Sequence, residues 1–145
     1  MTPTTRQIEL IQSAIPVITS NADAVAAAFY AQLFAIDSTL RPMFRGDMAE
    51  QGRKLMTMLG TALNNVNKLD TLHPALQSMG RRHIAYGVEK YHYGVVGQAL
   101  INTLDMAFGA AFTMEVRTAW VTLYGALVEA ITSGLYEPQT EAAAD

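Results

Sequence analysis

The residue with the most specific chemistry in this sequence is His83, in the stretch from residue 78 to residue 88. On a helical wheel it shares one face with four mostly apolar side chains: Leu72, Leu76, Met79 and Tyr86. That spacing is typical of an amphipathic helix with a buried apolar face, and Arg81 and Arg82 point away from that face. The imidazole is therefore either a core histidine bonded to a neighbouring carbonyl or a ligand to a metal or heme iron.

The composition indicates one domain with a large core and limits its partners. The chain has 145 residues, of which 50% are hydrophobic and 16% are charged, which leaves room for an apolar pocket. The formal net charge of −3 argues against nucleic acid as a partner. The sequence contains no cysteine, which excludes disulfides, thiolate metal sites and cysteine nucleophiles.

The N-terminal residues and the lengths of the apolar runs indicate where in the cell the protein is expected. The N-terminal residues are polar and lack the apolar core of a signal peptide. No run of about 18 apolar residues exists, so we expect no membrane span. We expect a cytoplasmic protein with a single domain over residues 1–136 and a short polar tail over residues 137–145.

Apolar residues recur at helical spacing, and no useful stretch alternates with period two, which predicts an all-α fold. Helices are predicted over residues 4–19, 22–35, 48–67, 72–86, 91–110 and 114–133, with a turn over 40–44 and a loop over 68–71. Pro16 is expected to kink or break the first helix, and Ser20 or Asn21 to cap the second. Gly87 should end the helix that carries His83, and Thr113 should cap the last helix.

Four more residues stand out from this helical pattern. Gln51 places an amide on the buried stripe of its helix, as a functional group or as a boundary residue near the helix start. Tyr30 is either a core tyrosine with a bonded hydroxyl or a phenol aimed into a pocket. His73 is expected to face solvent. Gly97, like its neighbours Gly94 and Gly109, is small enough to let another element approach closely.

Taken together, five local motifs resemble the globin family, specifically single-domain bacterial globins and the globin portion of flavohemoglobins. The resemblance covers about residues 4–135 and depends on the order and spacing of the motifs, because each alone is weak. The motifs are Phe29-Tyr30-x-x-Leu33-Phe34, Arg41-Pro42-Met43-Phe44, Gln51-x-Arg53-Lys54-Leu55-Met56, Gly80-Arg81-Arg82-His83 and His92-Tyr93-x-x-Val96-Gly97.

This resemblance implies a globin fold, a helical sandwich that encloses a pocket for heme b (iron protoporphyrin IX). It makes His83 the proximal iron ligand, Phe44 the ring that stacks on the porphyrin, and Tyr30 the distal tyrosine. Gln51 and Leu55 become the distal-helix pair over the iron. Further heme contacts are implied for the remaining matched positions: Met43, Val88, Tyr93 and Val96 on the walls, Lys54, Arg53 or Arg82 toward the propionates, and His92 toward a propionate or as a helix cap.

The implied function is reversible binding of O₂, and of NO and CO, at a pentacoordinate iron. Hydrogen bonds from Tyr30 and Gln51 would each stabilise a partially charged O₂ by about 1–3 kcal/mol, which predicts slow release. The same pocket suits nitric oxide dioxygenation, for which an external reductase is expected because the flavin and nicotinamide part of a flavohemoglobin does not follow within these 145 residues. A gas sensor or interaction module is the third alternative, and no oligomeric state is indicated.

Two positions depart from the pattern of the family. Gln51 stands where a distal histidine would allow bis-histidine ligation, so that state is not expected. Flavohemoglobins place a glutamate late in the last helix, where it bonds the tyrosine corresponding to Tyr93 and the proximal histidine, but this chain has Leu135 there, with Glu129 and Glu137 nearby but out of register. Without that carboxylate, peroxidase-like cleavage of an O–O bond is expected to be disfavoured.

Overall fold

Every regular element in the part of the chain that the structure describes is a helix. The computed structural model describes residues 2–44, 46–133 and 135, so the expected tail over residues 137–145 lies outside the described residues. The elements are α1 (Thr5–Ser20), α2 (Ala22–Ile36), η1 (Ser38–Met43), α3 (Met48–Asn64), η2 (Val66–Leu72), α4 (His73–Ala85), α5 (Lys90–Phe108), η3 (Gly109–Ala111) and α6 (Met114–Thr132), where η marks a 3-10 helix. The all-α class expected from the sequence is confirmed.

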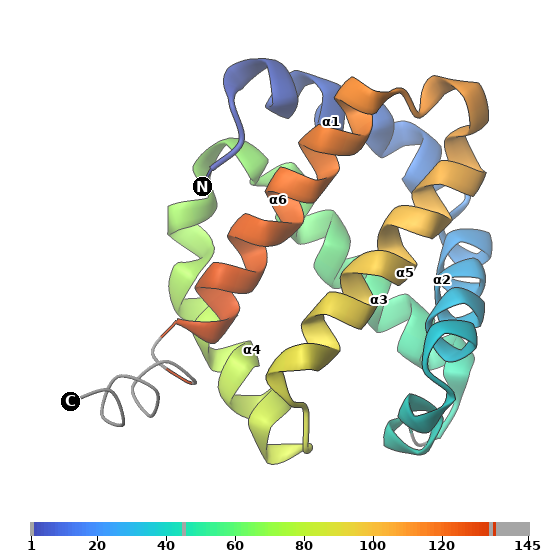
Figure 1. Ribbon diagram of the computed structural model, residues 1–145. Coiled ribbons are helices and arrows are strands. Elements are labelled where there is room, and N and C mark those ends of the chain that lie inside the picture. The colour runs from blue at the N-terminus through green and yellow to red at the C-terminus, as the bar shows by residue number, and fades with distance from the viewer. Residues whose placement is uncertain (1, 45, 134, 136–145) are drawn as a thin grey trace.

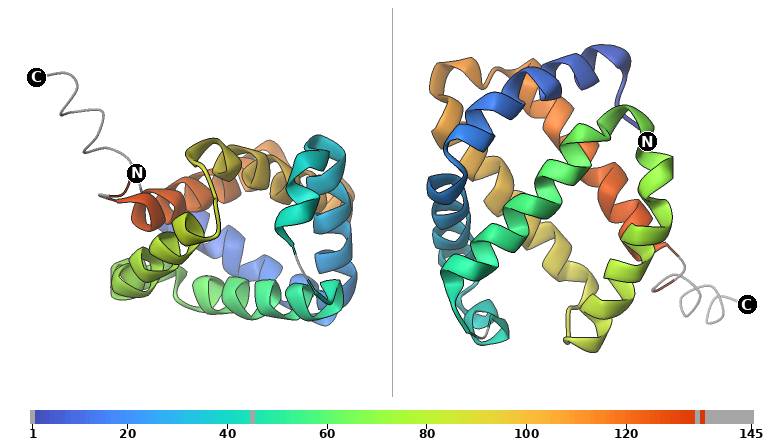
Figure 2. Two further views of the ribbon diagram at one scale, coloured as in Figure 1. Left: turned by 90° about the horizontal axis from the view of Figure 1, so that it is seen from below. Right: turned by 180° about the vertical axis from the view of Figure 1, so that it is seen from behind.

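The helices form two crossed layers, with α2 and α4 at opposite edges (Figure 1). In that view α5 and α6 make the front layer and α3 crosses behind them, while α1 packs against both α3 and α6. α2 packs against α3 and α5, and α4 packs against α6. Figure 2 shows α3 and α4 diverging from η2, which joins them. Among the described helices, none is long and apolar enough to cross a bilayer.

Polar side chains cap the starts of α1 and α6, where backbone N–H groups have no partner within the helix. At α1, Thr4 Oγ1 accepts from the N–H of Gln7 at 3.2 Å, and Gln7 Oε1 accepts from the N–H of Thr4 at 2.9 Å. This reciprocal pair is a capping box. At α6, Thr113 Oγ1 accepts from the N–H of Val116, as expected.

Of the kink or break expected at Pro16, the break does not occur, and the expected side-chain cap of α2 is wrong. α1 continues through Pro16 to Ser20, and the buried side chains of Ile11 and Ile18 hold the helix in the core on either side of the proline. Asn21 stands at the N-cap position of α2 but makes no side-chain cap hydrogen bond there. Its side chain and that of Ser20 instead donate to the carbonyl of Val17 at the end of α1. A carbonyl near a helix C-terminus has no partner within the helix and competes well for such donors.

The sequence also misplaces residues 68–71 and Tyr86. The segment expected as a loop belongs to η2, in which Lys68 alone leaves helical backbone angles. Tyr86, expected on the buried face with His83, is 71% exposed. α4 ends at Ala85, so the helical wheel does not apply to the residue that follows it.

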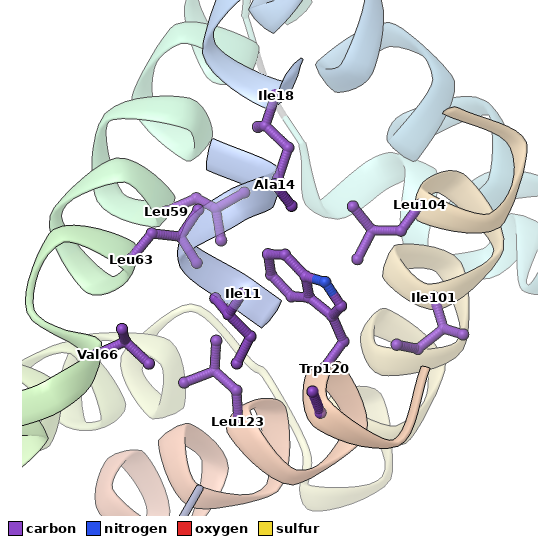
Figure 3. Packing of buried hydrophobic residues seen from close by; sticks show 11 residues of the cluster. Ile11, Ala14, Ile18, Leu59, Leu63, Val66, Ile101, Leu104, Trp120 and Leu123 are labelled. Carbon is purple, nitrogen blue, oxygen red and sulfur yellow. The ribbon is translucent and has the colours of Figure 1, made fainter. Parts of the chain in front are cut away.

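The main hydrophobic core lies at the α1 end of the molecule and is built around Trp120 (Figure 3). The indole is 1% exposed and packs among aliphatic side chains from α1, α3, η2, α5 and α6: Ile11, Ala14, Ile18, Leu59, Leu63, Val66, Ile101, Leu104, Ala119 and Leu123. This core fixes one end of α3, α5 and α6. Two smaller apolar clusters lie elsewhere, one around Phe29, Tyr30 and Leu33 and one around Leu76, Tyr93 and Ile131.

Candidate functional site

An apolar cavity draws its walls from the two smaller clusters. Its volume is about 160 Å³, which is smaller than the range of about 300–1,000 Å³ typical of small-molecule and cofactor sites. Its lining comes from α2, η1, α3, α4, α5, α6 and the segments between them: Leu33, Leu40, Met43, Phe44, Met58, Met79, His83, Val88, His92, Tyr93, Val96, Tyr124 and Ile131.

His83 enters this cavity from the last turn of α4 and is half-buried there. Its Nδ1 lies 3.1 Å from the phenol oxygen of Tyr93, with which it forms a hydrogen bond. Burial lowers the pKa of His83 below its ordinary value of 6.5, and the positive charge of the neighbouring Arg82 lowers it further. The imidazole is therefore neutral at pH 7, which is the form that binds metals.

The end of α4 fixes the backbone beside His83. Gly87 has a φ of +90°, which favours glycine, and it turns the chain after the helix. The N–H of Val88 then donates to the carbonyl of His83 at 2.9 Å. This turn brings Val88 back to the cavity wall and confirms that Gly87 marks the end of the helix.

Six of the predicted site residues meet at the cavity. The structure brings His83 together with the predicted heme contacts Met43, Phe44, Val88, Tyr93 and Val96. They come from four separate segments of the chain, so their convergence is a property of the fold. The roles assigned to them through the globin resemblance stay predictions.

The predicted distal residues lie beside the cavity and do not line it. The phenol of Tyr30 donates to the backbone carbonyl of Gln51 at 3.4 Å, a length at which a hydrogen bond is weak. Burial raises the pKa of Tyr30, so its hydroxyl stays protonated and able to donate. Gln51 is half-buried, and Leu55 packs in the Phe29–Tyr30–Leu33 cluster.

Three aromatic rings separate the cavity from a second hollow. The Tyr30 ring lies 5.4 Å from the ring of Phe44 and 6.1 Å from that of Phe34. Phe44 lines the cavity, whereas Tyr30 and Phe34 line an outer hollow of about 610 Å³ between α2, η1 and α3. The other walls of this outer hollow are mostly small residues with charged groups at the edge: Asp23, Ala26, Ala27, Ala31, Arg41, Met48, Ala49, Gly52 and Arg53.

Two of the basic residues expected near a cofactor, Lys54 and Arg82, do not line the cavity, whereas His92 does. Lys54 is exposed and pairs with Glu50 across one helical turn at 3.7 Å. Arg82 is exposed and donates to Ser78 Oγ at 3.0 Å. His92 is 7% exposed, and its Nδ1 accepts from the N–H of Glu89 at 2.8 Å. Of the two roles considered for His92, the structure therefore shows the cap at the start of α5.

Sequence reasoning missed a further group of cavity residues. Leu33, Leu40, Met58, Met79, Tyr124 and Ile131 line the cavity without having been assigned to it. All but Leu40 lie on expected helices, and period alone cannot separate a cavity wall from a filled core. Tyr124 has one signal in the sequence, because Gly97 indicates that some neighbour approaches α5 closely.

Comparison with known sequences identifies similar proteins. The chain matches the family model described as Globin over residues 27–131. The neuroglobin of Danio rerio is 31% identical over 119 residues, which cover 72% of this chain and 75% of that protein. The flavohemoprotein of Bacillus subtilis is 27% identical over 146 residues, which cover 95% of this chain and 36% of that protein. The chain thus spans about a third of the length of that flavohemoprotein.

Comparison with solved structures gives the same fold. An engineered carbene transferase, made from a Rhodothermus marinus protein regarded as a nitric oxide dioxygenase, superimposes with a TM-score of 0.83. The match covers 98% of this chain and 99% of that structure at 21% sequence identity. At this identity the likeness supports the fold and says nothing of a shared activity.

Proposed function

This chain belongs to the globin family, and from that premise we propose that it holds heme b in the cavity and binds O₂ reversibly. His83 is the proposed iron ligand. Heme would supply an iron with an axial position open to a diatomic gas. The chain supplies the ligand nitrogen, the apolar walls and the hydrogen-bond donors.

The lining of the cavity suits a largely apolar group that carries a metal. This lining is dominated by aliphatic, aromatic and methionine side chains. Such side chains favour contact with the apolar face of a porphyrin over contact with a hydrated polar group. His83 and His92 provide imidazoles among these groups, of which that of His92 is engaged as a helix cap, and Phe44 provides an aromatic ring. The polar propionates need basic partners, for which Arg53, Lys54 and Arg82 are proposed.

The observation that carries the proposal is the hydrogen bond between His83 Nδ1 and Tyr93. Because the phenol holds Nδ1 at 3.1 Å, Nε2 is left as the ring nitrogen for a metal. A histidine that ligates a metal almost always engages its other nitrogen in this way, which fixes the orientation of the ring.

Tyr30 and Gln51 are the proposed donors to a gas ligand. The Tyr30 hydroxyl stays protonated, and its bond to the Gln51 carbonyl at 3.4 Å is long. A long bond costs little to exchange for a better acceptor, such as an O₂ that carries partial negative charge. The amide of Gln51 can add a second donor from the same helix. These residues favour O₂ over CO, because CO carries less charge to stabilise.

Absorption spectra of the purified protein test this proposal. We expect heme to copurify or to be taken up from added hemin, with a pentacoordinate ferrous form that changes on addition of O₂ or CO. A folded preparation that does not take up added hemin would contradict the proposal. A ferrous form with two strong axial ligands would support the heme site but contradict the open axial position.

Nitric oxide dioxygenation is the second candidate, because the similar proteins include a flavohemoprotein and a protein regarded as a nitric oxide dioxygenase. In that reaction O₂ and NO combine to nitrate, and a reductase would then have to restore the ferrous iron. An assay of NO consumption with a supplied reductase and NADH separates the two candidates. Sustained turnover supports the enzyme, and a single burst equal to the amount of protein supports reversible binding.

A further inference from the structure

A tyrosine of α6 contacts the backbone of the residue that holds His83. The Tyr124 hydroxyl donates to the carbonyl oxygen of Tyr93 at 2.6 Å, a short and well-formed hydrogen bond. Tyr93 is 7% exposed, and its own phenol lies on His83 Nδ1. Both tyrosines line the cavity. A continuous series of polar contacts thus runs from α6 through α5 to the imidazole on α4.

Gly97 makes room for this contact. A Cβ at position 97 would lie 2.6 Å from Cε2 and 3.0 Å from Cδ2 of Tyr124, far closer than carbon atoms pack. Gly94 lies on the same helix, and a Cβ there would meet nothing within 4 Å. The Tyr124 ring therefore needs glycine at position 97 and does not need it at position 94.

Leu135, which follows α6, does not supply such a contact. It approaches α4, because a Cβ at Gly80 would lie 2.8 Å from Leu135 Cδ1. Its side chain is aliphatic and offers no acceptor or charge to the Tyr93 phenol. Tyr124 is the residue of α6 that donates to the Tyr93 backbone among the described residues.

We propose that Tyr124 and Gly97 are positioning residues for His83. By holding the Tyr93 backbone against α6, Tyr124 sets where the Tyr93 phenol meets Nδ1 and therefore how Nε2 faces the cavity. Partners that orient a ligating histidine tune its bond to the metal. Here Tyr93 is that partner, and Tyr124 in turn positions Tyr93. This inference rests on the proposed role of His83 as the iron ligand.

Three variants and two readouts test the inference. We expect Tyr124→Phe and Gly97→Ala to shift the iron–histidine stretching band in the ferrous resonance Raman spectrum, and to speed heme dissociation about threefold. Tyr93→Phe, which removes the orienting phenol itself, sets the upper limit for the increase in the rate of heme dissociation, about tenfold. Gly94→Ala is the matched control and should leave both readouts unchanged. A role in stability alone would lower the unfolding midpoint without moving the Raman band.

A heme-free readout separates this inference from the proposed function. The ¹⁵N chemical shifts of His83 in the apoprotein report its tautomer and its bond to Tyr93, and we expect Tyr124→Phe to change them while Gly94→Ala does not. If the wild type takes no heme, the proposed function fails, and these shifts still decide whether Tyr124 orients the ring. Tyr124→Phe loses a single oxygen, so it decides the matter if Gly97→Ala does not fold. Shifts and Raman band unchanged in Tyr124→Phe would overturn the inference.

Discussion

The two sides of the cavity are built differently. On the side of α4 and α5, His83, Tyr93 and Tyr124 all line the cavity and are linked by bonds of 3.1 and 2.6 Å. On the side of α2 and α3, Tyr30 faces the outer hollow, and its link to Gln51 is 3.4 Å long. The first side holds its groups in place before any ligand arrives. The second side keeps a protonated donor on a bond that is easily exchanged.

This difference matches the tasks proposed for each side. A metal ligand must hold one orientation continuously, because a loose imidazole would release the cofactor. A donor to a gas must engage and disengage as the ligand arrives and leaves. The comparison therefore predicts that substitutions on the α4–α5 side change cofactor retention, whereas those on the α2–α3 side change gas kinetics.

The largest kinetic effect is expected for Tyr30→Phe, which removes the donor and keeps the ring. Loss of one hydrogen bond of about 1.4 kcal/mol should raise the O₂ dissociation rate about tenfold, measured by stopped-flow displacement of O₂ with CO. Heme retention should not change. Tyr86→Phe, at a position 71% exposed, is the control. An unchanged rate in Tyr30→Phe would assign the donor role to Gln51 or to a water.

A smaller effect is expected from filling the outer hollow. Ala31 lines this hollow beside Tyr30, and Ala31→Trp should obstruct gas that passes the Tyr30 ring. A barrier higher by about 0.7 kcal/mol would slow O₂ association and dissociation equally, about threefold, and leave the affinity unchanged. Flash photolysis measures both rates. Ala35→Trp, one turn along on the exposed surface, is the control, and equal rates in the two variants would show that gas enters elsewhere.

The smallest effect concerns the pH dependence of apoprotein stability. Burial lowers the pKa of folded His83 below 6.5, so the unfolded chain takes up the proton first as the pH falls. Stability is therefore lost as the pH drops below about 6.5 and stops changing below the folded pKa. Urea unfolding at several pH values should show a shallower loss in His83→Gln. An identical slope in the variant would mean that His83 is not shielded from water.

The helices and the α4–α5 side of the cavity were largely predictable from the sequence. Apolar periodicity gives the long helices, and the motif around His83 resembles globins closely enough to select Phe44, Val88 and Tyr93 as its neighbours. The family and the globin fold expected from these motifs are both confirmed by the comparisons. The roles of these four residues, His83 included, toward a heme stay predictions.

Other features depend on contacts that no local pattern contains. Gly94 and Gly97 of α5 look alike in sequence, but only the position of Tyr124 separates Gly97 from Gly94. The need for glycine at position 97 is therefore set by the tertiary surroundings of the residue.

The central claim is that the His83 imidazole is the ligand of an iron porphyrin, and hemin titration of His83→Gly tests it most directly. We predict that the wild-type apoprotein takes up one equivalent of hemin, and that His83→Gly loses this uptake and regains it when imidazole is added to the buffer. His73→Gly, the matched control, should bind like the wild type. If His83→Gly binds hemin with the wild-type affinity and spectrum in the absence of imidazole, the claim is contradicted.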